Sequence, residues 1–169
     1  MRLTSAIINL LALTLCVFAA AAPEVMDSPQ NVKYEANFHE GVEGSIKFKA
    51  NSEGQVKVNF KLHGFPEEGA PFLYHVHEKP VPSNGSCDAA LGHLNPYNGS
   101  PDATDDADKE VGDLSGKHGN ITTNPFKTCY VDPYLSLNKT DPAFIGNLSI
   151  VVHFANETRL ACANITRIK

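Results

Sequence analysis

Alternation of hydrophobic and polar residues is the strongest local pattern in this chain. Residues 56–62 alternate strictly between the two kinds, and residues 46–49 do the same over a shorter stretch. A period of two residues is typical of a strand that buries one face and exposes the other. Residues 51–54 read Asn-Ser-Glu-Gly and separate the two runs, so the sequence predicts an antiparallel hairpin here.

Five further segments have the composition of strands. They are residues 32–38, 72–77, 127–131, 146–154 and 159–168. Residues 78–113 show no period and contain many prolines and glycines, which predicts one long loop of the kind that usually carries function. No helical period exceeds a turn or two, and no second-domain boundary is visible. Seven or eight short strands joined by turns indicate an all-β protein, an antiparallel β-sandwich.

The first residues have the pattern of a secretory signal. Arg2 supplies a positive start, and residues 7–22 are almost wholly apolar and end in small residues. Cleavage after Ala21 fits this pattern best, with residues 1–21 as the signal peptide and residues 22–169 as the mature domain. The alternative is a membrane anchor, but the apolar run is shorter than the ~20 residues that a spanning helix needs.

Composition and charge narrow the class of protein. The 169 residues are 42% hydrophobic and 20% charged, which is ordinary for one globular domain. The formal net charge is −5, and it would be more negative without Arg2. The chain contains no basic cluster of the kind that would indicate binding to nucleic acid or to an anionic membrane. An anionic substrate would therefore have to be attracted by local positive charge.

Cysteines and glycosylation sequons fit a secreted protein. Cys16 would leave with the signal, and the mature chain would keep Cys87, Cys129 and Cys162. In an oxidising compartment we expect one disulfide and one odd thiol, which could stay free or pair between chains. The density of Asn-x-Ser/Thr sequons predicts glycosylation at some of them. The candidates are Asn84, Asn98, Asn120, Asn138, Asn147, Asn156 and Asn164.

Four histidines are candidates for a metal site. His75 and His77 lie two residues apart at the end of a predicted strand, so both side chains point to the same face. His93 lies in the long loop, and His153 follows an apolar strand. Three or four neutral imidazoles suit copper or zinc, and copper(II) binds such sites most tightly. By contrast, we interpret three histidines as surface or structural residues: His39, His63 and His118.

Short segments around these histidines resemble the copper-zinc superoxide dismutase family. The matching segments are residues 63–65, 74–78, 92–96, 111–114, 145–146, 151–153 and 159–162. They occur in family order and span nearly all of residues 32–168. The resemblance implies an eight-stranded antiparallel Greek-key β-sandwich, or flattened barrel, with a long metal-site loop; this family is itself a known example of the sandwich architecture.

The resemblance also implies roles for individual residues. The implied copper ligands are His75, His77, His93 and His153, of which His93 corresponds to the imidazole that bridges copper and zinc. Arg159 resembles the guanidinium beside the copper that attracts superoxide. Cys87 and Cys162 resemble the disulfide that ties the loop to the last strand.

Two departures from the family pattern concern zinc and the loop over the copper. Pro101 and Glu110 stand where the family has its second and third zinc histidines, so only His93 and Asp113 remain of four ligands. A structural zinc site needs four good ligands, so we expect no zinc. The family's long charged loop is reduced to residues 154–158, which should leave the copper open to solvent.

This combination is similar to the copper-only superoxide dismutases, extracellular enzymes of fungi and related organisms. The resemblance implies that a glutamate at the position of Glu110 takes over from zinc. Physically, Glu110 could accept a hydrogen bond from the free ring nitrogen of His93 and so orient the ring. Asp113 is expected to be a further supporting carboxylate. The implied activity is conversion of superoxide to oxygen and hydrogen peroxide by alternating copper oxidation states.

These observations lead to one functional hypothesis and two alternatives. We expect a secreted, or cell-wall-associated, copper enzyme that acts on superoxide as a monomer, with one copper per chain and with no nucleic-acid partner and no membrane span. The first alternative is a secreted copper-binding or copper-buffering protein with the same fold and little turnover. The second is a cupin-type metal oxygenase, which the absence of an acid at residues 81–83 disfavours.

Overall fold

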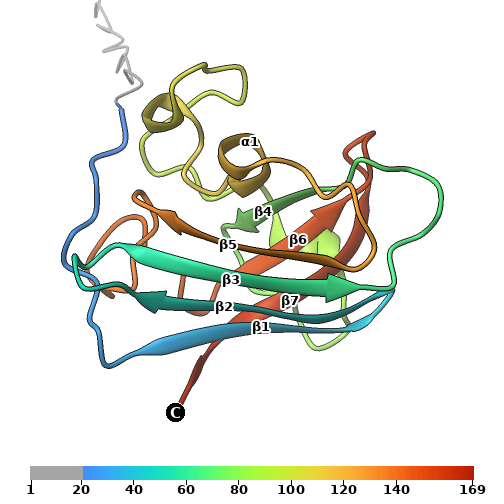
Figure 1. Ribbon diagram of the computed structural model, residues 1–169, viewed down its shortest axis with the longest axis horizontal. Coiled ribbons are helices and arrows are strands. Elements are labelled where there is room, and N and C mark those ends of the chain that lie inside the picture. Colours follow the sequence, from blue (N-terminus) through green and yellow to red (C-terminus); the bar gives the residue numbers. More distant parts are fainter. Residues whose placement is uncertain (1–20) are drawn as a thin grey trace, which may run out of the picture.

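The computed structural model describes residues 21–169, in which seven strands form one antiparallel sheet (Figure 1). The strands are β1 (Lys33–Glu40), β2 (Val42–Ala50), β3 (Val56–His63), β4 (Leu73–His77), β5 (Phe126–Asp132), β6 (Ser149–His153) and β7 (Arg159–Ile168). The predicted signal peptide and Cys16 fall on residues 1–20, outside the described part of the chain.

The sheet curls into two layers around the hydrophobic core. Its strand order is β4-β6-β7-β1-β2-β3-β5, and in Figure 1 the layer formed by β1, β2, β3 and β5 lies in front of β4, β6 and β7. The alternating side chains of the front layer send their hydrophobic members inward, where Phe48 and Phe60 are fully buried, as is Tyr74 of the other layer. β6 is buried along its whole length, because it lies between β4 and β7.

The predicted hairpin at residues 51–54 joins β2 to β3. Oδ1 of Asn51 accepts hydrogen bonds from the backbone N–H groups of Glu53 and Gln55, both at 2.9 Å. Gly54 has φ +82°, and a Cβ built there would lie 2.1 Å from the carbonyl oxygen of Met26. This turn therefore requires glycine for both its backbone conformation and the close approach of the N-terminal segment.

The described part of the chain has seven strands, one fewer than the eight that the family resemblance implies. Residues 133–148 form an irregular segment, in which Ser136 and Phe144 make an isolated parallel bridge. Pro133 and Pro142 lack the N–H group that a continuous ladder needs, which accounts for the interruption. The antiparallel β-sandwich itself is confirmed.

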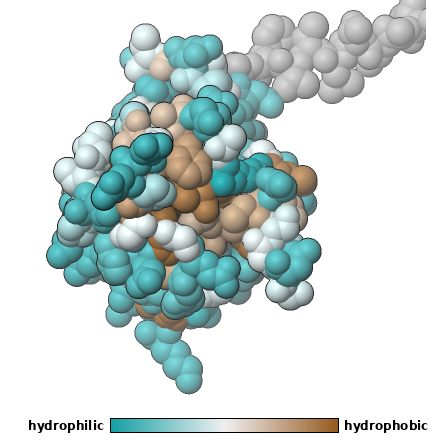
Figure 2. Space-filling model, turned by 90° about the vertical axis from the view of Figure 1, so that its right-hand side faces the viewer, coloured by the Kyte–Doolittle hydropathy of each residue, from teal (hydrophilic) through white to brown (hydrophobic). Residues whose placement is uncertain are grey.

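Three short helices interrupt the predicted long loop and the segment that follows it. They are η1 (Cys87–Ala90), η2 (Asp106–Asp108) and α1 (Leu114–His118). None of the helices in residues 21–169 is long and apolar enough to cross a membrane. At the end of the molecule shown in Figure 2, hydrophobic residues gather in a hollow ringed by hydrophilic ones. Elsewhere in the core, Phe72 packs between Phe65 and Phe154, with ring centroids 5.1 and 5.9 Å away.

A buried carboxylate ties α1 to the sheet. Oδ2 of Asp132, the last residue of β5, lies 2.7 Å from Nζ of Lys117 and 2.8 Å from Nε2 of His118. Its Oδ1 accepts hydrogen bonds from the backbone N–H groups of residues 134 and 135, at 2.9 and 3.0 Å. Because Asp132 is fully buried, this network fixes α1 and the turn after β5 against each other.

Candidate metal centre

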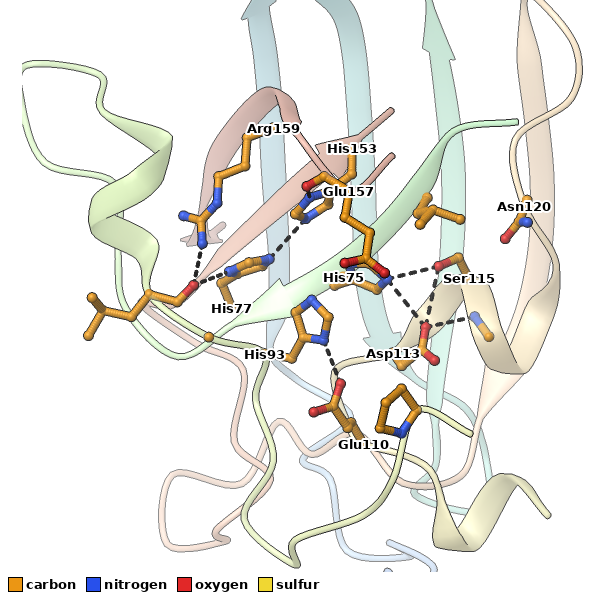
Figure 3. A pocket seen from close by; sticks show the side chains of 15 residues that line it. His75, His77, His93, Glu110, Asp113, Ser115, Asn120, His153, Glu157 and Arg159 are labelled. Atoms are coloured by element: carbon orange, nitrogen blue, oxygen red, sulfur yellow. Dashed lines mark hydrogen bonds and ion pairs between the residues drawn. The ribbon is translucent and has the colours of Figure 1, made fainter. Parts of the chain in front are cut away.

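Two strand ends and one loop bring four histidines together. His75 and His77 lie on β4, which pairs with β6, and His153 is the last residue of β6. His93 comes from the loop after η1, and its backbone bridges to that of His77. One ring nitrogen from each of the four lies within 4.8 Å of the others. Figure 3 shows the four imidazoles turned toward a common space.

Backbone carbonyls hold two of the imidazoles. Nδ1 of His77 lies 2.9 Å from the carbonyl oxygen of Leu91, and Nδ1 of His153 lies 2.8 Å from that of Glu157. A carbonyl oxygen only accepts, so Nδ1 carries the proton in both rings and Nε2 carries the lone pair. The two Nε2 atoms lie 3.1 Å apart, an arrangement that favours a cation near both.

Side chains hold the other two imidazoles. Nε2 of His75 lies 3.1 Å from Oγ of Ser115 and 3.4 Å from Oδ1 of Asp113. Nδ1 of His93 lies 2.5 Å from Oε2 of Glu110. The other nitrogen of His75, Nδ1, is buried and has no hydrogen-bond partner among the described residues. Each of the four rings is therefore held through one nitrogen and leaves the other available.

The protonation of these rings fits a metal ion. Burial lowers the pKa of His77 to about 3 and that of His153 to about 4. Burial also lowers the pKa of His75. These three imidazoles are therefore neutral near neutral pH, which is the form that binds a metal. A set of neutral imidazoles with converging lone pairs fits copper.

The positions expected for zinc do not form a second site. Pro101 offers no donor atom, and Glu110 is turned toward His93. Nδ2 of Asn95 donates to Oε1 of Glu110 at 3.3 Å, which helps to fix the carboxylate in that orientation. Within residues 21–169, the four histidines are the only group of three or more potential ligands that converge.

Asp113 serves the structure around His75. Its Oδ1 accepts a hydrogen bond from the backbone N–H of Gly116 at 2.7 Å and so caps α1. Burial alone would raise the pKa of Asp113, but its hydrogen bonds with His75 and Gly116 lower that pKa on balance. The carboxylate is therefore ionised and orients the imidazole of His75.

Arg159 begins β7 and reaches across to η1. Its guanidinium donates hydrogen bonds to the carbonyl oxygens of Cys87 and Leu91. A disulfide joins Cys87 to Cys162 of β7. Because the carbonyl of Leu91 also holds Nδ1 of His77, the guanidinium is fixed beside the histidine cluster.

A cavity of about 550 Å³ lies over the histidine cluster (Figure 3). Its polar lining residues include the four histidines, Glu110, Asp113, Ser115, Asn120 and Arg159. Only residues 154–158 connect His153 to Arg159, and Glu157 of this short connection is among the residues that line the cavity. A small anion entering it meets the positive charge of Arg159.

The glycosylation candidates differ in exposure. The exposed ones are Asn84, Asn98, Asn120, Asn147 and Asn156. Asn138 and Asn164 are partly buried, and the amide of Asn164 hydrogen-bonds both the N–H and the carbonyl of Val81. Use of the sequons stays a prediction, which the structure narrows to the exposed asparagines. The odd cysteine, Cys129, is an exposed free thiol on β5.

Some groups at the site were absent from the sequence-based prediction. The carbonyls of Leu91 and Glu157 carry no signal in the sequence, since every residue has one. Ser115 and Asn95 touch His75 and Glu110 respectively. Ser115 could have been proposed as a partner of the site, because it lies two residues after Asp113, which caps α1, and its hydroxyl donates to the Asp113 carboxylate.

Known proteins similar to this chain agree with the geometry. Residues 42–165 match the family described as copper/zinc superoxide dismutase. The cell surface Cu-only superoxide dismutase 5 of Candida albicans is 49% identical over 158 residues, which cover 90% of this chain and 69% of the relative. A cell surface Cu-only superoxide dismutase of Arthroderma benhamiae is 34% identical over 196 residues, which cover 94% of this chain and 52% of the relative.

A solved structure shares both the fold and much of the sequence. The structure of Candida albicans superoxide dismutase 5 with Cu(II) matches with a TM-score of 0.80 at 48% identity, over 82% of this chain and 93% of that chain. Residues 42–165, which match the family, include the strands and the loop that carry the four histidines. This chain therefore belongs to the copper/zinc superoxide dismutase family.

Proposed function

We propose that this chain is a secreted or cell-surface superoxide dismutase that uses copper without zinc. The observation that carries the proposal is the convergence of four imidazole nitrogens within 4.8 Å, beside the anchored guanidinium of Arg159. The Cu-only names of two relatives support it. The copper would be held by His75, His77, His93 and His153.

The chain's own residues then have separate tasks. A bound copper ion supplies one-electron chemistry by alternating between two oxidation states. Arg159 attracts superoxide, an anion, toward a chain whose net charge is −5. Glu110 keeps the proton on Nδ1 of His93, so its Nε2 is the nitrogen that ligates or accepts a proton. The His93 side chain is 27% exposed, which suits it to hand a proton to the peroxide product.

Metal analysis together with a superoxide assay tests this function. We expect the purified protein to bind one copper per chain, to retain no zinc after dialysis, and to consume superoxide. Stoichiometric zinc that survives dialysis would refute the copper-only assignment. Copper binding without turnover would instead support the alternative of a copper-buffering protein.

We also propose that residues 1–21 are a secretory signal and that residues 22–169 are the mature domain. The apolar run with its small-residue end supports this boundary. N-terminal sequencing of the secreted protein should begin at Ala22. A start elsewhere would move the boundary.

We further propose that the mature chain is a monomer. Among the described residues, the exposed large hydrophobic side chains are only Met26, Leu91 and Val131, too few for the apolar core of a stable interface. Light scattering should give the mass of one polypeptide together with its glycans. A mass of two chains would contradict the proposal.

A further inference from the structure

The outer face of the front layer concentrates lysines, although the whole chain is acidic. Strands β1, β2, β3 and β5 turn every second side chain outward. Six of these outward residues are lysines: Lys33, Lys47, Lys49, Lys57, Lys61 and Lys127. We call this set the lysine face. Glu35 and Glu43 are the acidic residues among the outward positions of these strands, whereas the formal charge of the chain is −5.

The strand register places several of these lysines directly opposite one another. Lys33 pairs with Lys49 across β1 and β2, and Lys49 pairs with Lys57 across β2 and β3. Lys61 pairs with Lys127 across β3 and β5. Neighbouring strands lie ~4.8 Å apart, and like charges that face each other at this spacing destabilise a sheet.

Little within the described residues offsets this repulsion. Lys47 forms an ion pair with Glu35, with Nζ 3.3 Å from Oε1. The other lysines of the lysine face make no ion pair in residues 21–169. A set of positive charges aligned across three strands and left unpaired is therefore available to an external anion.

Two ordinary explanations do not account for the pattern. Lysines on an edge strand discourage pairing with other chains, and Lys127 on β5 can serve that purpose. However, β1, β2 and β3 are interior strands, so Lys33, Lys49 and Lys57 protect no edge. Solubility also does not require them, because these lysines reduce the magnitude of a negative net charge.

The lysine face is also open to a large partner. A hollow of about 280 Å³ lies on it, lined by Lys33, Lys47, Lys49 and Asn59, together with Phe48, Ile168 and Lys169. Asn59 adds an amide between the ammonium groups. All seven sequons lie outside the outward positions of β1, β2, β3 and β5, so no glycan would be attached to a residue of the lysine face.

We propose that the lysine face binds an acidic polysaccharide. A linear polymer with regularly repeated anionic groups matches rows of ammonium groups spaced by strand geometry, and its binding would relieve their mutual repulsion. Single-stranded nucleic acid is disfavoured because the outward positions of these strands carry no Phe, Tyr or Trp on which bases could stack. An anionic membrane is disfavoured because Val131 is the one large hydrophobic residue exposed there.

Retention of the copper-loaded, mature protein on immobilised heparin tests the proposal. We expect the protein to bind at low salt in spite of its negative net charge, and to pass through uncharged dextran. The double variant K49Q/K57Q should elute at lower salt, and the slope of log affinity against log salt should fall by about two, one for each lost charge. The matched control is K79Q/K139Q, which removes two exposed lysines outside the lysine face and should elute like the unaltered protein.

Superoxide turnover and melting temperature show whether the variants are folded. Both double variants should keep full turnover, because the lysine face shares no residue with the metal centre, and K49Q/K57Q should melt no lower than the unaltered protein. Failure to bind heparin at low salt, or equal losses in the two double variants, would overturn the proposal. Tighter binding to oligo(dT), or to phosphatidylserine vesicles, than to heparin would also overturn it and assign the face to nucleic acid or to membranes.

Discussion

At the scale of single residues, the site depends on which nitrogen of each imidazole is held. Four different partners hold the rings: two backbone carbonyls, the hydroxyl of Ser115 and the carboxylate of Glu110. The two carbonyls and the carboxylate only accept, so they fix a tautomer, and all four partners fix a ring orientation before metal arrives. The free nitrogens are therefore preorganised. Among these partners, Glu110 stands where the copper-zinc family has a zinc-binding histidine.

Replacement of Glu110 should test its positioning role for His93. In E110A, Nδ1 of His93 loses the acceptor that lies 2.5 Å away, so we expect turnover or copper affinity to fall about 10- to 100-fold. E110Q keeps an oxygen acceptor and should lose less. Turnover, copper titration and the EPR spectrum of the copper site would be compared, with the exposed E53A as control. An unchanged EPR spectrum and rate in E110A would exclude the role.

Replacement of Arg159 should separate its charge from its hydrogen bonds. In R159Q the local positive charge is lost, so we expect turnover at low ionic strength to drop about tenfold, with a smaller difference at high salt. R159K keeps the charge but loses the planar fork that bonds Cys87 and Leu91, so it should retain most of the salt dependence. Equal rates for R159Q and the unaltered protein at low salt would eliminate electrostatic attraction.

At the scale of secondary-structure elements, the sequence predicted strands better than the connections between them. Alternation located β2 and β3, because each buries one face of a sheet, and composition located β1. The His-x-His spacing and the family resemblance named the residues that converge at the metal centre. Neither source predicted η1, η2 or α1, since helices this short are set by tertiary hydrogen bonds and not by a period.

The lysine face is a further feature that the sequence alone did not predict. The chain has no basic cluster along its sequence, which is evidence against binding to nucleic acid or to an anionic membrane, but an acidic polysaccharide was not considered. The lysines gather only when strand register aligns Lys33, Lys49 and Lys57 across three strands. Alternation reveals that each lysine points outward, but it does not reveal which lysines become neighbours.

The disulfide should stabilise the connection between η1 and β7. Cys87 and Cys162 are 75 residues apart in sequence, so their link restricts a long loop in the unfolded chain. We expect the double variant C87S/C162S to be less stable by about 2–5 kcal/mol, and reducing agent to have a similar effect. Denaturant unfolding measures this difference. C129S, which removes the free thiol, should unfold like the unaltered protein, and insensitivity to reductant would contradict the prediction.

At the scale of the whole molecule, charge is distributed unevenly. The net charge is −5, yet positive groups gather on the lysine face and at Arg159 in the cavity wall. We propose that the two positive regions attract different anions: the lysine face binds an acidic polysaccharide, and Arg159 attracts superoxide into the cavity. The rest of the surface carries the acidic excess, which keeps the protein soluble and discourages self-association.

The stability of the whole fold should depend on pH through Asp132. Burial alone would raise the pKa of this carboxyl group, but Lys117 and His118 beside it lower the pKa to about 2, from the usual 3.8. A depressed pKa means that the ionised carboxylate stabilises the fold fully above the unfolded pKa. We therefore expect on the order of 2 kcal/mol of stability to be lost as pH falls from about 4 to about 2.

The variant D132N tests this account. Nζ of Lys117 is almost completely buried, so loss of its anionic partner should destabilise the protein by about 3 kcal/mol at neutral pH. The difference from the unaltered protein should shrink toward pH 2, where Asp132 itself becomes protonated. Denaturant unfolding at several pH values measures both effects, with D102N as an exposed control. A difference that stays constant down to pH 2 would mean that the ion pairs of Asp132 do not produce the acid sensitivity of the fold.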